Sequence, residues 1–102
     1  MRLTPTQQTA ILDCAHRHFG DDAQVWLFGS RVDDHKRGGD IDLWVECHET
    51  DVPVLINQKL HFLVDLQRRI GEQKIDVVLS YPGQRQPPAI VGIARDSGIR
   101  LQ

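Results

Sequence analysis

The sequence lacks the features of exported or membrane proteins. No uninterrupted apolar run in its 102 residues is long enough to span a bilayer. Its first residues do not combine a basic segment with an apolar one, as a secretory signal would. We therefore expect a cytoplasmic protein that enters no membrane.

Cysteine is scarce. The two cysteines, Cys14 and Cys47, lie far apart and form no Cys-x-x-Cys pair. A disulfide framework or a zinc cluster needs closely patterned cysteines, so neither is expected. Both cysteines are predicted to be small buried residues.

The chain also lacks a large excess of either charge. Twelve Lys and Arg residues against 14 Asp and Glu residues give a formal net charge of -2. Domains that bind nucleic acid usually carry a strong positive excess, because phosphate contacts dominate their affinity. Nucleic acid is therefore not an expected partner. The length predicts one domain, residues 1–102, with a single core.

What the sequence does contain is three acids, each set in an apolar segment. Asp40 and Asp42 flank Ile41 after a Gly-Gly pair, and Asp76 lies in Ile-Asp-Val-Val-Leu. Alternate residues of a strand share a face, so these acids are predicted to point away from the core. Carboxylates held close together repel one another unless a cation neutralises them, and their oxygens suit Mg²⁺ or Mn²⁺. The acids therefore predict a metal site.

A Gly-Ser pair follows the apolar segment 24–28, which is predicted to be an interior strand because both its faces are apolar. Ser30 is placed to cap a short helix, and Gly29 lets a phosphate approach the backbone. Both are predicted to bind phosphate. The charged run that follows is interpreted either as solvated loop or as a source of cations for a polyphosphate, namely Arg31, Lys36 and Arg37.

Two longer helices are predicted around these motifs. Thr4-Pro5-Thr6-Gln7 forms a capping box for the first, which Gly20 ends. The second, which Asp51 or Thr50 can cap, is predicted to end at about Gly71 and to cover the apolar back of the sheet. Its predicted apolar stripe comprises Val52, Ile56, Leu60, Leu63, Leu66 and Ile70. Pro88 is predicted to start a short helix, and residues 99–101 to form a brief edge strand.

Two kinds of side chain allow more than one interpretation. Trp44 follows Asp42 on the acid face, where it could stack on a nucleotide base or cover the open side of the sheet or a partner interface. His16 and His18 are interpreted as exposed, or as favourably placed near the helix C-terminus.

Together these motifs resemble the minimal nucleotidyltransferases of the polymerase-beta superfamily. The signature of that family is Gly-Ser, a spacer, Asp-x-Asp and a third Asp on a later strand. Here these are Gly29-Ser30, residues 31–39, Asp40-Ile41-Asp42 and Asp76, and the likeness extends from about the first helix to the last. The resemblance implies an α/β (α+β) domain of the polymerase-beta-like nucleotidyltransferase fold, a small mixed sheet with helices packed on one face and acids on the other.

The resemblance also implies a function, the Mg²⁺-dependent transfer of AMP from ATP to an acceptor hydroxyl. Asp40 and Asp42 would hold two Mg²⁺ ions, or Mn²⁺, while Asp76 would bind the catalytic metal and help to deprotonate the acceptor. The implied acceptor is a tyrosine of a HEPN-domain toxin, with this chain as its antitoxin. Because larger members of the superfamily carry a further domain for the acceptor, the acceptor site is expected on a HEPN-domain partner and/or another copy of the chain.

Three alternatives remain open. A small-molecule nucleotidyltransferase of the aminoglycoside-modifying kind would need an acceptor pocket that this chain could build only as a dimer. A catalytically silent antitoxin would act by binding alone. Acids that are merely solvated would not explain three aspartates opposite apolar residues next to a Gly-Ser phosphate site.

Overall fold

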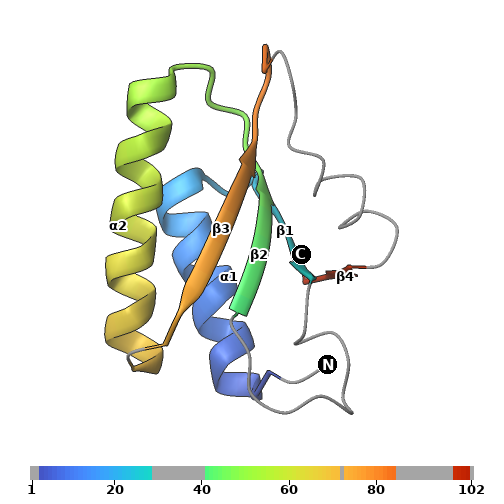
Figure 1. The fold of residues 1–102 in the computed structure, drawn as a ribbon, viewed down its shortest axis with the longest axis vertical. Coiled ribbons are helices and arrows are strands. Elements are labelled where there is room, and N and C mark those ends of the chain that lie inside the picture. The colour runs from blue at the N-terminus through green and yellow to red at the C-terminus, as the bar shows by residue number, and fades with distance from the viewer. Residues whose placement is uncertain (1–2, 29–40, 72, 85–97, 102) are drawn as a thin grey trace.

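A computed structural model describes residues 3–28, 41–71, 73–84 and 98–101 of the chain. In these residues two helices pack on one face of a four-stranded sheet, as Figure 1 shows. The elements in chain order are α1 (Pro5–Phe19), β1 (Gln24–Phe28), β2 (Ile41–Glu46), α2 (Val52–Ile70), β3 (Ile75–Ser80) and β4 (Ile99–Arg100). The predicted α+β fold with helices on one face of a mixed sheet is confirmed.

The described strands lie in the order β3-β2-β1-β4. Strand β1 pairs antiparallel with β2 and with β4, whereas β2 and β3 are parallel and α2 connects them. The interior position predicted for residues 24–28 and the edge strand predicted near the end are therefore both confirmed. The short helices predicted after Ser30 and after Pro88 lie outside the described residues.

The core lies between the sheet and the two helices. Alternate residues of the central strands face it and are fully buried, among them Leu27 of β1 and Leu43 of β2. The two cysteines belong to this core as predicted, and burial raises the pKa of the Cys14 thiol to about 11 and that of Cys47 to about 12. Both thiols therefore stay protonated at neutral pH, which makes them poor nucleophiles.

Both helices begin and end at the predicted residues. At the start of α1, the Gln7 backbone N–H donates to the Thr4 hydroxyl and the Thr4 N–H donates to the Gln7 side chain, each at 3.0 Å. At the start of α2, the Asp51 carboxylate accepts a hydrogen bond from the Val54 backbone N–H at 3.4 Å. Gly20 and Gly71 follow the two helices with φ of 100° and 88°, which glycine adopts at little cost.

The buried face of α2 differs from the prediction. Leu55 and Phe62 are buried, whereas Ile56 and Leu60 are each 54% exposed. Phe62 packs against Phe19 of α1 with ring centroids 5.2 Å apart, so the contact with α1 selects this face. The first half of the predicted stripe was wrong because α2 is apolar on more than one side, and periodicity alone does not choose between faces. Neither described helix is long and apolar enough to cross a membrane.

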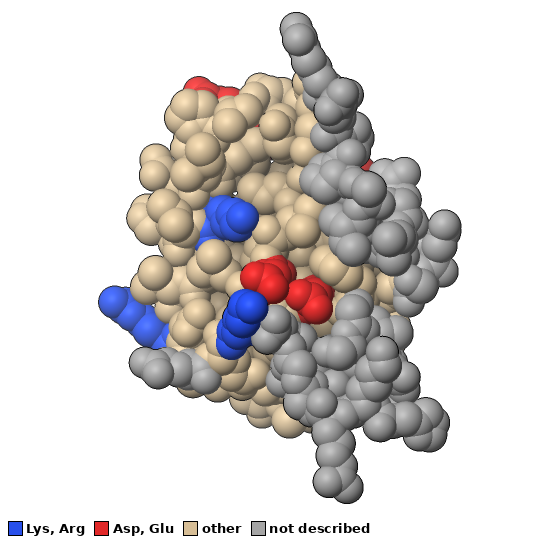
Figure 2. All heavy atoms as spheres, in the orientation of Figure 1, with Lys and Arg blue, Asp and Glu red and all other residues tan. Residues whose placement is uncertain are grey.

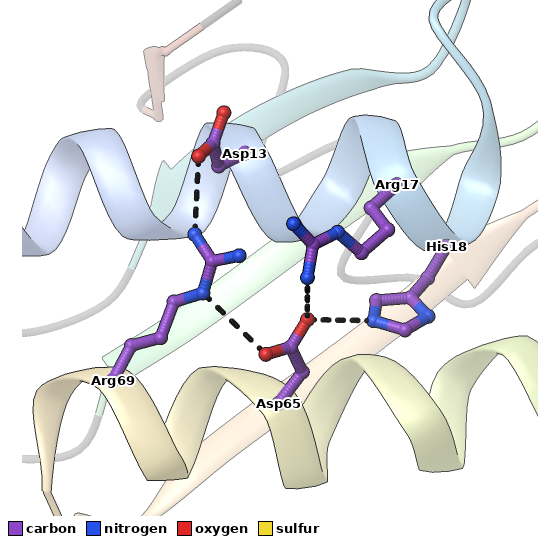
Figure 3. A network of polar contacts seen from close by, with 5 residues as sticks. All are labelled: Asp13, Arg17, His18, Asp65 and Arg69. Carbon is purple, nitrogen blue, oxygen red and sulfur yellow. Dashed lines mark hydrogen bonds and ion pairs between the residues drawn. The ribbon is translucent and has the colours of Figure 1, made fainter.

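A network of charged side chains joins α1 to α2 (Figure 3). Its centre is Asp65 of α2, which bonds to His18 of α1 at 2.9 Å and pairs with Arg17 and Arg69, each at 3.4 Å. Arg69 also reaches back to Asp13 of α1 at 3.1 Å. The hydrogen bond from His18, with the nearby arginines, lowers the pKa of Asp65 below 3.8. His18, which we interpreted as exposed or placed by the helix C-terminus, thus has a specific partner.

The lowered pKa of Asp65 predicts a pH-dependent stability. A carboxyl group with a lower pKa in the folded state stabilises the fold above its unfolded pKa, and that contribution disappears as the pH falls through the folded pKa. Asp65→Asn should therefore lower the urea midpoint at neutral pH, and the difference from wild type should shrink as the pH falls below 3.8. The matched control is Asp21→Asn, at an exposed site before β1. A deficit of equal size at neutral and strongly acidic pH would contradict the assignment.

Candidate functional site

The candidate site lies at one end of the sheet, where β1 stops and β2 and β3 start. Asp42 of β2 is the partner of Phe28 of β1 on one side and of Asp76 of β3 on the other. The two aspartates therefore occupy matching positions on neighbouring strands. They share the face opposite the helices, because their chain neighbours Ile41, Leu43 and Val77 face the core and alternate strand residues point to opposite faces. The register agrees with the convergence predicted for the three acids as far as Asp42 and Asp76 are concerned, and Asp40 lies outside the described residues.

Backbone pairing sets the distance between the two carboxylates. Neighbouring strands lie about 4.8 Å apart, so side chains at matched positions can reach a common cation. The register is fixed at this end because the Ile41 N–H donates to the Lys74 carbonyl at 3.0 Å. Asp42 is half-buried and Asp76 is exposed. Two negative charges this close favour a cation between them, and carboxylate oxygens suit Mg²⁺ or Mn²⁺.

The remaining predicted site residues adjoin this end of the sheet in the sequence. Gly29 directly follows Phe28, and Asp40 directly precedes Ile41. Both lie outside the described residues. The same holds for the other residues predicted to contact phosphate, which are Ser30, Arg31, Lys36 and Arg37. No group of three His, Cys, Asp or Glu side chains that could hold a metal occurs in the described ranges. The predicted set has three acids, and its third member, Asp40, is one of the residues that the structure does not describe.

Aromatic side chains cover the acid face beside the two aspartates. Trp44 is fully buried there and stacks on Trp26 of β1, with ring centroids 4.3 Å apart. Phe28 and Val78 complete this second, smaller cluster. Because Trp44 has no exposed ring face, stacking on a nucleotide base is excluded for it in this structure. The alternative, that it covers the open side of the sheet, is confirmed.

Two cations near this face were not singled out from the sequence. The Arg100 guanidinium of β4 lies over the Trp26 ring, 5.5 Å from its centroid. Lys74 is exposed directly before β3, two residues ahead of Asp76. In Figure 2, lysine or arginine atoms lie beside aspartate or glutamate atoms near the middle of the molecular face in view. The sequence did contain a signal for Lys74. It lies two positions before Asp76, and alternate residues of a strand share a side of the sheet.

The family of the chain follows from a comparison with models of known protein families. A model described as the nucleotidyltransferase domain matches residues 9–101. The chain belongs to this family. The match begins within α1 and extends past β4, so it includes both described aspartates and every predicted site residue. A comparison with curated proteins gave no significant match. Membership of the nucleotidyltransferase domain family supports the polymerase-beta superfamily and a general nucleotidyl-transfer activity.

Cation binding at the candidate site can be tested directly. Asp42→Asn should remove most of the rise in melting temperature that Mg²⁺ or Mn²⁺ with ATP gives the wild type, because half of the observed carboxylate pair is lost. A ligand at about 100 times its Kd stabilises the folded state by about 2.7 kcal/mol. Differential scanning fluorimetry measures the shift.

The matched control for Asp42→Asn is Glu46→Gln, which removes a carboxylate from the same face of β2 at its other end. This variant should keep the full shift. Equal shifts in wild type and Asp42→Asn would show that the pair binds no cation.

Proposed function

We propose that this protein transfers a nucleoside monophosphate, AMP from ATP, to an acceptor hydroxyl with the help of Mg²⁺. The observation that carries the proposal is the pairing of Asp42 with Asp76 at the end of the sheet where β1 leads into Gly29-Ser30. The carboxylate pair thus lies at the end of the sheet from which the sequence continues into the predicted phosphate-binding motif. The family match supports the general reaction.

Each predicted residue has a role in this proposal. Asp40, Asp42 and Asp76 would hold Mg²⁺, which when bound offsets negative charge on the triphosphate and on the leaving pyrophosphate. Gly29 and Ser30 would bind phosphate oxygens through backbone N–H groups and a hydroxyl. The three cations of the 31–39 segment would contact the polyphosphate, namely Arg31, Lys36 and Arg37.

The reaction itself is an in-line displacement at the α-phosphorus. The acceptor oxygen forms a bond to this phosphorus while the bond from the α-phosphorus to the bridging oxygen breaks. Asp76 takes the hydroxyl proton, and pyrophosphate leaves with the electrons of the broken bond. The exposure of Asp76 at the start of β3 supports this role, because an acceptor can approach it.

We propose that the acceptor is a protein, a tyrosine of a HEPN-domain toxin, which gives this chain the role of an antitoxin. Resemblance to the minimal nucleotidyltransferases is the source of this assignment. The exposure of Asp76 on the face of the sheet opposite α1 and α2 supports it, since a macromolecule could reach this acid there. A partner neutralised by contact alone is the competing outcome.

Asp76→Asn separates catalysis from binding. The variant should keep much of its nucleotide binding through Asp42 and Asp40 but lose transfer, because the acceptor hydroxyl loses its base. Wild type and variant are each incubated with ATP, Mg²⁺ and the HEPN-domain product of a neighbouring gene, and the partner is analysed by intact mass. An added adenylyl group with the wild type only is expected. Neutralisation by both proteins without any mass gain would replace the enzyme with the binding-only antitoxin.

The Gly-Ser motif gives a graded prediction. Gly29→Val should weaken ATP binding more than Ser30→Ala, because a branched side chain would stand where the phosphate approaches the backbone, whereas Ser30→Ala removes a single donor. Isothermal titration with ATP and Mg²⁺ measures both affinities. Circular dichroism must first show that both variants fold. An unchanged affinity in a folded Gly29→Val variant would rule out the phosphate role.

A further inference from the structure

The outward face of α2 carries an exposed apolar stripe that the proposed chemistry does not use. It consists of four residues at intervals of four, Val52, Ile56, Leu60 and Val64, which are 43%, 54%, 54% and 53% exposed. Single exposed apolar residues are common, but an aligned row on one helix is typical of an interaction surface. In Figure 1, α2 lies on the outer side of the molecule, so the stripe is open to a partner.

We propose that this stripe is the contact between two copies of the chain, with the two α2 helices packed antiparallel across Leu60. Leu60 lies midway between Ile56 and Val64, so a two-fold axis there places Ile56 of one copy opposite Val64 of the second copy. Rows of side chains at intervals of four form ridges, and helices that pack such a ridge against a row at intervals of three cross at only about 20°, close to antiparallel. A hollow of about 410 Å³ lined by Leu63, Val64, Gln67 and Arg68 continues the stripe and would receive Ile56 of the second copy.

The charges of α2 select a second copy in this orientation. Glu49 and Asp51 stand at the start of the helix, and Arg68 is exposed at its end. Arg69 is already paired with Asp13 and Asp65 of the same chain. Asp65, the one acid inside α2, contacts α1 instead. An antiparallel copy places the acidic start of one helix near the basic end of the other, within the roughly 10 Å over which charges act at 0.1 M salt. A parallel copy would place like charges together.

The position of the stripe also suits a dimer that keeps its chemistry accessible. Asp42 and Asp76 lie on the face of the sheet opposite the helices, so pairing through α2 covers neither acid. A single row of side chains is smaller than the roughly 20–30 residues a side of a standard stable interface. We therefore expect a dimer whose population depends on protein concentration, and this inference is independent of the proposed reaction.

Sedimentation equilibrium over a range up to millimolar protein tests the dimer. Wild type should shift from monomer to dimer as concentration rises, and Leu60→Glu should remain a monomer, because it would place two buried carboxylates on the axis. Since Leu60 is exposed in the single chain, the variant should keep the wild-type melting temperature. Thr9→Glu, which introduces the same charged residue at an exposed position of α1, is the control and should dimerise.

Cysteine cross-linking under oxidation tests the orientation. Leu60→Cys should form a disulfide dimer, and Ile56→Cys mixed with Val64→Cys should form a heterodimer. Ile56→Cys alone should not, because two such positions lie about 12 Å apart along antiparallel helices, beyond the roughly 7 Å limit for a disulfide. Thr9→Cys controls for random cross-linking, and the buried native Cys14 and Cys47 should not react.

Four results would overturn the proposal. They are a monomer at every concentration, a dimer that Leu60→Glu leaves unchanged, self-cross-linking of Ile56→Cys, and a monomer whose stripe instead binds the HEPN-domain partner, shown by loss of that complex in Leu60→Glu. The proposed transfer reaction is tested by the mass of the partner in the Asp76→Asn experiment, whereas the dimer is tested by sedimentation and cross-linking. Either proposal can therefore fail while the other holds.

Discussion

The parallel pairing of β2 with β3 is the constraint on which both the core and the candidate site depend. It sets Leu43 beside Val77 on the inner face and Asp42 beside Asp76 on the outer face. A slip of one residue would turn every side chain of β3 over, which would bury Asp76 and expose its apolar neighbours. The same apolar burial that stabilises the fold therefore holds two like charges next to each other. The repulsion between the two carboxylates costs less free energy than the loss of several apolar contacts in the core would.

The helices contribute to the site by occupying one side only. Because α1 and α2 cover the inner face together, the outer face can carry polar groups and a smaller aromatic cluster. Asp65 fixes the relation of the two helices through His18 and Arg17, and Asp13 of α1 is joined to α2 through Arg69. These contacts lie on the helical side of the molecule. The described part of the chain thus separates the groups that hold the helices together from those that face a substrate.

Much of the fold could be predicted because its signals are local. The capping box at Thr4 and the glycines at 20 and 71 depend on residues a few positions apart, and they were placed correctly. Of the two caps considered for α2, Thr50 and Asp51, the structure uses Asp51. The outward direction of Asp42 and Asp76 followed from strand periodicity together with a known family pattern, whereas their pairing in register is seen only in the structure. Contacts between distant segments were harder. Phe19 selects the face of α2 that contains Phe62, His18 meets Asp65, and Trp26 buries Trp44, and none of these pairs leaves a periodic signal in the sequence.

The position of β3 at the border of the described sheet gives Asp76 a second physical role. A border strand presents unpaired N–H and C=O groups that can pair with a strand of another molecule, and charged side chains discourage such pairing. Lys74 and Asp76 place one charge of each sign at the start of this strand, and Asp76 projects from it into solvent. The carboxylate proposed for proton transfer would thus also discourage pairing of this strand with another molecule. Selection for solubility and selection for chemistry would then act on the same residue.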